Sequence, residues 1–282
     1  LLSPRHVRVG GLLQQGCKRG RFQVQVIFPG ATHRPKDIAA AVGLFPDPVL
    51  GYQLLASLAV VLTAWLIYAV ARWFTSFGPA LAAAAAYPAW LLVFAGIGGQ
   101  SPVFYNLPMA IAAVWVMAKF VAADDRRLTL HGCGIMLLVG VAIQIKYTAV
   151  FEGIFFGLSL LWTGWQHRRS LFRVMADGAV WIAAALVPTL AAWGTYAAIG
   201  QGEAFVQANF LSVIADTNLF LPALGRLGGL LFGLSPLYVC IWFAWRHWWG
   251  IEGSQAKEVR WLFAWALASL IGFLAFGVWN DH

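Results

Sequence analysis

The sequence predicts an all-α fold, a polytopic transmembrane bundle of about eight helices. Hydrophobic residues make up 61% of the 282 residues, charged residues make up only 11%, and the mean hydropathy is +0.73. This composition excludes a soluble globular domain. The apolar residues form continuous runs of about 20, which is the length a helix needs to cross a bilayer. The strands of a membrane β-barrel would instead alternate apolar and polar residues.

Eight apolar segments define the predicted helices, and spanning segments must satisfy their own backbone hydrogen bonds, which favours helix for each. In chain order they cover 51–72, 79–98, 104–122, 129–146, 148–165, 178–199, 227–245 and 261–279. The segment 98–108, with two prolines, predicts a shaped turn at the mouth of a cavity, and a simple hairpin explains it equally. Residues 200–226 mix Phe and Leu with polar residues, as expected for a helix in the membrane interface or for a plain loop.

The connections between these segments differ in charge from one side of the bundle to the other. Of the basic residues in these connections, only Lys146 and Arg226 lie on one side of the bundle. The positive-inside rule assigns the other side, which holds the remaining basic residues, to the cytoplasm. The basic residues therefore orient the chain and do not form the stripe typical of nucleic-acid binding. The ten basic residues of the predicted cytoplasmic side are Arg72, Lys119, Arg126, Arg127, Arg168, Arg169, Arg173, Arg246, Lys257 and Arg260.

The first 44 residues differ from the rest of the chain. Residues 1–36 carry seven basic residues, no acidic residue and no apolar run of signal-peptide length. The predicted orientation places them outside, the reverse of the usual charge rule. We interpret 1–44 as an atypical segment that is not authentic. Residues 45–282 are predicted as one transmembrane domain, truncated at its C-terminus, in a fragment of a longer protein.

Two ionisable residues lie close together in the apolar sequence. Lys146 falls at the external junction of two predicted helices, and Glu152 falls inside the second of them. A charge at membrane depth costs roughly 2.5–3.5 kcal/mol on insertion scales, so such residues are functional candidates. Lys146 either extends its ammonium to the interface or binds an anionic lipid head group. Glu152 either makes a buried hydrogen bond or ion pair with a neighbouring helix, or it is a functional residue.

No glycine-rich phosphate loop and no metal-ligand spacing occurs in the sequence. We therefore expect no evident cofactor and no metal-binding residue. A substrate of this chain is expected to arrive through the bilayer.

Six short segments stand out in a fixed order along 45–282. They are FPDPVLGYQLL (45–55), AVARWF (69–74), GQSPVFYNLPM (99–109), QIKYT (144–148), FEG (151–153) and the terminal NDH (280–282). Together these segments resemble the GT-C membrane glycosyltransferases of bacteria, in the family 39-like, protein mannosyltransferase-like group. Their order carries the resemblance more than any one motif.

The resemblance implies a multi-pass enzyme of the bacterial inner membrane that uses a polyprenyl-phosphate sugar as donor. The acceptor would be an extracytoplasmic glycan such as lipopolysaccharide, a lipid or a protein. An inverting transfer needs a carboxylate as general base, and Asp37 is the candidate, although its neighbours do not match the family motif. Lys146 matches the position of a phosphate-binding group, and a divalent metal is implied by analogy alone. The expected substrate cavity includes Gln100, Tyr105, Asn106, Glu152 and His282.

Two other classes of function fit the residues. A transporter or flippase-like carrier of an anionic amphipathic substrate would use Lys146 and Glu152 along its path, although the halves of the chain show no repeat. A non-catalytic membrane scaffold, or an inactive fragment of an active parent, would explain the lack of a convincing base.

Overall fold

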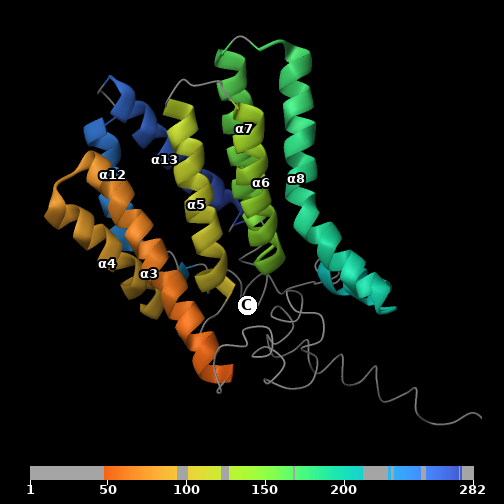
Figure 1. Ribbon diagram of the computed structural model, residues 1–282. Helices are drawn as coiled ribbons and strands as arrows, with labels where there is room; N and C mark the ends of the chain where they lie inside the picture. The colour runs from red at the N-terminus through yellow and green to blue at the C-terminus, as the bar shows by residue number, and fades with distance from the viewer. Residues whose placement is uncertain are drawn as a thin grey trace, which may run out of the picture.

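A computed structural model describes residues 48–93, 101–121, 127–167, 169–211, 228–229, 232–248, 252–272 and 274. The described residues form helices and no strand, so the predicted all-α helical bundle is confirmed (Figure 1). In chain order the helices are α3 (Pro48–Phe74), α4 (Phe77–Val93), α5 (Ser101–Val121), α6 (Leu128–Ile145), α7 (Ala149–Gln166), α8 (Leu171–Ala198), α9 (Gly202–Val206), the π-helix η1 (Gln207–Leu211), α12 (Ser235–Trp248) and α13 (Ser254–Gly272).

Every predicted segment corresponds to a helix, but two helices begin earlier than expected. The prediction began α8 at 178 and α13 at 261, after the charged residues that precede these positions. The structure begins α8 at Leu171, where the Ser170 hydroxyl accepts a hydrogen bond from the Arg173 backbone N–H at 3.3 Å. The Ser170 cap therefore lets the helix continue through charged turns that the apolar pattern does not include.

Within the described residues, four helices are long and apolar enough to cross a membrane: α3, α5, α6 and α8. The other predicted spans are either shorter than these four helices or less apolar. Helix α4 has 17 residues and α12 has 14, fewer than the roughly 20 that a full span needs. Helices α7 and α13 have near-span lengths of 18 and 19 residues, but tryptophans and polar residues lower their hydropathy. In the segment 200–226, for which the sequence predicts an interfacial helix or a plain loop, α9 and η1 are short helices, and residues 212–226 lie outside the described residues.

The helices run up and down, so that helix termini gather at two opposite ends of the bundle (Figure 1). We call one of them the basic end, where α3 meets α4, α5 meets α6, α7 meets α8 and α12 meets α13. Residues from distant parts of the chain meet at this end: Gln255 Nε2 donates to the Trp73 carbonyl oxygen at 3.2 Å, and the Phe74 and Trp248 rings lie 6.3 Å apart. The other end, which we call the Lys146 end, holds the tight turn between α6 and α7.

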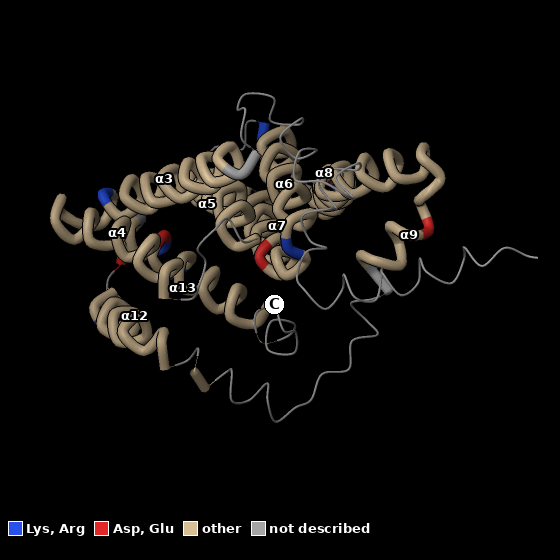
Figure 2. Tube along the Cα trace, turned by 90° about the horizontal axis from the view of Figure 1, so that it is seen from below, with Lys and Arg blue, Asp and Glu red and all other residues tan. Residues whose placement is uncertain are grey.

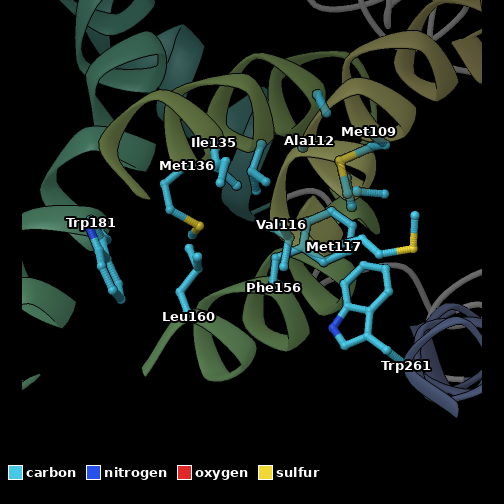
Figure 3. Packing of buried hydrophobic residues seen from close by; sticks show 14 of the residues in the cluster. Met109, Ala112, Val116, Met117, Ile135, Met136, Phe156, Leu160, Trp181 and Trp261 are labelled. Carbon is cyan, nitrogen blue, oxygen red and sulfur yellow. The ribbon is translucent and has the colours of Figure 1, made fainter. Parts of the chain in front are cut away.

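The core lies among α5, α6, α7, α8 and α13 (Figure 3). Phe156 of α7 is fully buried and stacks on Trp261 of α13, with ring centroids 5.8 Å apart. Outside the core, many large apolar side chains are exposed, including Val61, Trp65 and Ile182 at 60–62%. An apolar outer surface of this kind is stable in a bilayer, where lipid covers it.

Close packing of α6 on α8 depends on residues without side chains. A Cβ atom on Gly140 would overlap the carbonyl oxygen of Ala185, and one on Gly132 would overlap the Trp181 indole. Small residues at such positions let membrane helices approach closely. This contact fixes the orientation of α6, whose last residues lead into the Lys146 turn.

Candidate functional site

Lys146 is the C-cap residue of α6 and begins the short turn into α7. Its own backbone is extended, with φ −150° and ψ 114°, and its N–H still donates to the Ala142 carbonyl oxygen at 2.8 Å. The Ala149 N–H then donates to the Lys146 carbonyl oxygen at 3.1 Å. The turn therefore holds the Lys146 side chain at the helix junction, as the sequence predicts, half-buried among α5, α6 and α7.

The ammonium of Lys146 lies against an aromatic ring of α5. Its Nζ is 5.4 Å from the centroid of the Tyr105 ring, within the range of a cation–π interaction. No carboxylate of the described residues lies at ion-pair distance from this nitrogen. The ring therefore positions the ammonium without neutralising its charge.

Glu152 lies in the first turn of α7, close enough to interact electrostatically with Lys146 and Tyr105. Its Oε2 accepts a hydrogen bond from Trp265 Nε1 at 2.6 Å, and Ser269 also donates to the carboxylate. Trp265 and Ser269 are four residues apart and so share one face of α13. In Figure 2, which views this end of the bundle, basic and acidic positions lie together beside the label of α7.

Asn106 faces a different set of partners from its neighbour Tyr105. Its Nδ2 donates to the Tyr87 hydroxyl of α4 at 3.1 Å, and Tyr87 also shares a hydrogen bond with Thr63 of α3. Asn106 therefore links α5 to α3 and α4. The structure brings together Tyr105, Lys146 and Glu152, with Asn106 one residue along α5.

The predicted residues Asp37, Gln100 and His282 lie outside the described residues, as does the predicted boundary at 44. Their roles stay predictions. The sequence does not predict Tyr87 as the partner of Asn106, or Trp265 and Ser269 as the partners of Glu152. Tyr87 could be found from the sequence because it is a polar residue in an alanine-rich helix. Nothing in the sequence distinguishes Trp265 and Ser269 from other residues of membrane helices.

A hydrogen bond near the turn anchors α6 to α8. Gln144 Nε2 donates to Thr189 Oγ1 at 2.5 Å, two residues before Lys146. Hydrogen bonds between membrane helices are worth about 0.6 kcal/mol on average, with some near 1.7. This bond supports the position of the turn from the side opposite to α13.

A second polar cluster lies at the basic end and differs in that its charges are paired. The Asp177 carboxylate is buried, and Arg169 Nη1 lies 2.5 Å from its Oδ2. Its Oδ1 accepts from Thr129 Oγ1 at 2.7 Å and lies 3.5 Å from Arg173 Nε. Because both oxygens are engaged, we assign this cluster to the stability of the α6–α8 contact.

The described residues do not fit a metal. No three His, Cys, Asp or Glu side chains gather among them in a metal-binding group.

Comparison with known families identifies the chain. The family described as dolichyl-phosphate-mannose-protein mannosyltransferase matches residues 38–193, which include Tyr105, Lys146 and Glu152. No curated protein and no solved structure matches the chain. The match covers 156 of the 282 residues, so the chain belongs to this family of membrane glycosyltransferases and is a multi-pass membrane protein.

Proposed function

We propose that this chain moves a sugar from a polyprenyl-phosphate donor to an extracytoplasmic glycan, lipid or protein, and that Lys146 binds the donor phosphate. One observation carries the proposal. The Lys146 ammonium lies at a helix junction against the Tyr105 ring, with no carboxylate of the described residues at ion-pair distance. A half-buried ammonium held in this way suits an anionic ligand from the bilayer.

The chemistry of sugar transfer gives this ammonium a catalytic use. The acceptor oxygen bonds to the anomeric carbon while the bond from that carbon to the phosphate oxygen breaks. The polyprenyl phosphate leaves with an additional negative charge, and a general base takes the acceptor proton. A fixed positive group stabilises the charge that develops on the departing phosphate more than the charge of the bound donor.

Glu152 has a positioning role in this proposal. A second negative charge beside a phosphate is unfavourable unless other groups compensate for it. Trp265 and Ser269 donate hydrogen bonds to Glu152, and these bonds hold the carboxylate on the α13 side. Glu152 therefore attracts the Lys146 ammonium from one side, while Tyr105 contacts it from α5.

Other parts of the proposal rest on the family and the sequence. Asp37 is the candidate general base, and Gln100, Asn106 and His282 are candidate cavity residues. The positive-inside rule predicts that the Lys146 end lies outside the cytoplasm. The sequence resemblance implies the inner membrane of a bacterium. Polyprenyl-phosphate mannose is the first donor to test, because the family's description names a lipid-linked mannose.

The test measures binding and transfer separately. Membranes containing the full chain are exposed to a photoreactive polyprenyl phosphate, and transfer is followed with radiolabelled polyprenyl-phosphate mannose and glucose. Lys146→Ala is compared with Lys146→Arg, which keeps the charge, and with Lys119→Ala, which removes a lysine at the basic end of α5. The labelling assay reports on the phosphate site even if transfer requires a base outside this site.

We expect Lys146→Ala to reduce specific labelling at least about tenfold, because a charge-assisted hydrogen bond contributes roughly 1.5–3 kcal/mol. Lys119→Ala should label normally, and Lys146→Arg should retain most of the labelling. Equal labelling of Lys146→Ala and the unmodified chain would refute the phosphate role. Transfer from neither donor by a chain that labels normally would refute these donors and leave the phosphate site intact.

A further inference from the structure

A cavity of about 1280 Å³ lies between α7 and α13, away from the Lys146 turn. Its walls are apolar side chains of the two helices, among them Phe155, Leu158, Trp162 and Trp261. Leu158 and Trp162 are 58% and 55% exposed, so the cavity opens at the lipid-facing surface of α7. We therefore call it the α7–α13 groove. Its volume exceeds the roughly 300–1,000 Å³ of sites for drug-sized ligands.

The polar lining of this groove includes basic residues. Among the described residues that line the groove, Lys257 and Arg260 of α13 and His167 after α7 are basic, Gln166 is uncharged, and none is acidic. On α13 and just before it, the acidic residues are Glu252, which is exposed, and Glu258, which is half-buried. Neither lines the groove, so its charge is complementary to an anion.

The groove extends from its basic rim, formed by His167 and Lys257, for about the depth of one bilayer leaflet. His167 follows the last turn of α7, and Lys257 lies in the first turn of α13, both at the basic end. From His167 to Leu158 along α7 is about 13 Å at 1.5 Å per residue. One leaflet of a bilayer core is about 15 Å deep. The apolar wall therefore spans most of one leaflet below the rim.

We propose that this groove binds an anionic phospholipid of the leaflet at the basic end. Lys257 and Arg260 contact the head-group phosphate, and an acyl chain lies along Leu158, Trp162 and Phe155. Basic pockets between membrane helices on the cytoplasmic side are suited to such head groups. The site lies at the opposite end of the bundle from Lys146, so its ligand is not the donor of the proposed transfer reaction.

The test compares two lipids and two pairs of charge variants. The full chain is placed in nanodiscs of dioleoylphosphatidylcholine with a minor fraction of dioleoylphosphatidylglycerol, and the lipids that stay bound are counted by native mass spectrometry. The groove variant carries Lys257→Gln with Arg260→Gln. The control carries Arg72→Gln with Arg246→Gln, which removes two charges at the same end of the bundle outside the groove.

We expect the unmodified chain and the control to retain phosphatidylglycerol over phosphatidylcholine. The groove variant should lose roughly ten- to thirty-fold in this preference, since each basic residue near the surface contributes about 1 kcal/mol. Size-exclusion profiles show whether each variant is folded. Equal preference in the groove variant and the control, or no preference in the unmodified chain, would overturn the proposal.

A second pair of variants tests the apolar half without changing charge. Trp162→Ala removes a wall of the groove, whereas Trp65→Ala removes a similarly exposed tryptophan from α3. Retention of phosphatidylglycerol should fall several-fold in Trp162→Ala alone. Retention that is the same in both would place the lipid elsewhere. Because these measurements use no sugar donor, they are independent of the proposed glycosyl transfer.

Discussion

Trp265 Nε1 lies 2.6 Å from Glu152 Oε2, and this hydrogen bond joins α13 to α7 beside the Lys146 turn. The two residues are 113 positions apart in the sequence. Glu152 is half-buried in the first turn of α7, where a negative charge interacts favourably with the helix dipole. The helix dipole therefore attracts the Glu152 carboxylate at this position, in addition to the interaction of Glu152 with Lys146.

Glu152→Ala should destabilise the protein by about 1–3 kcal/mol, because it leaves the Trp265 and Ser269 donors without their acceptor. Glu152→Gln should cost less, since the amide oxygen still accepts these bonds. Thermal unfolding in detergent measures both. A double-mutant cycle with Trp265→Phe should give a coupling energy of at least about 0.5 kcal/mol. A coupling energy near zero would show that the bond contributes nothing to stability.

The ring of Tyr105 should matter more than its hydroxyl for the Lys146 ammonium. Tyr105→Phe keeps an aromatic face below Nζ, whereas Tyr105→Leu removes it. We expect Tyr105→Leu to weaken labelling by the photoreactive polyprenyl phosphate about fivefold, as follows from a cation–π interaction of about 1 kcal/mol. Tyr105→Phe should stay within about twofold of the unmodified chain. The opposite order would show that the hydroxyl, and not the ring, is needed.

The sequence alone was sufficient for the helices and for the two charges of the site. Continuous apolar runs have one stable form in a bilayer, and a lysine and a glutamate within them are conspicuous because each is costly there. The partners of these charges could not be predicted in the same way. Trp265 is one of 15 tryptophans, and only the packing of α13 on α7 distinguishes it from those that face lipid.

The early start of α8 has a related cause. The apolar pattern predicts that the helix begins after Asp177, because the charged residues Arg173 and Asp177 are expected to lie outside the membrane. In the structure Asp177 is buried and paired with Arg169, so its charge is compatible with a helix interior. Tertiary pairing of this kind is not visible in local hydropathy, and it explains why the predicted boundary was seven residues late.

Asp177→Ala should be among the most destabilising single changes at the basic end. It leaves the Arg169 guanidinium, whose side chain is only 11% exposed, without its carboxylate. Breaking a buried pair by removing one partner costs about 3–5 kcal/mol. Glu203→Ala, at an exposed position of α9, is the matched control and should change stability by less than about 0.5 kcal/mol. Thermal unfolding of the two variants in the same detergent provides the comparison, and similar midpoints would contradict the buried-pair assignment.

Gly140→Ala should loosen the packing of α6 on α8, because the added Cβ would overlap the Ala185 carbonyl oxygen and approach Pro188. Overpacking of this kind costs roughly 1–3 kcal/mol. Gly157→Ala is the control, since a Cβ on Gly157 of α7 meets nothing within 4 Å and alanine favours helix. We expect a lower unfolding midpoint for the first variant and an unchanged or higher one for the second.

The same pair of variants tests whether the α6–α8 contact positions the Lys146 turn. Gly140 lies one helical turn before Gln144, and the side-chain amide of Gln144 donates a hydrogen bond to Thr189 of α8. If α6 moves away from α8, this bond lengthens and the turn two residues later shifts. Labelling by the photoreactive polyprenyl phosphate should therefore fall in Gly140→Ala and stay normal in Gly157→Ala. Normal labelling in a destabilised Gly140→Ala protein would show that the turn is held by α5 and α13 without help from α8.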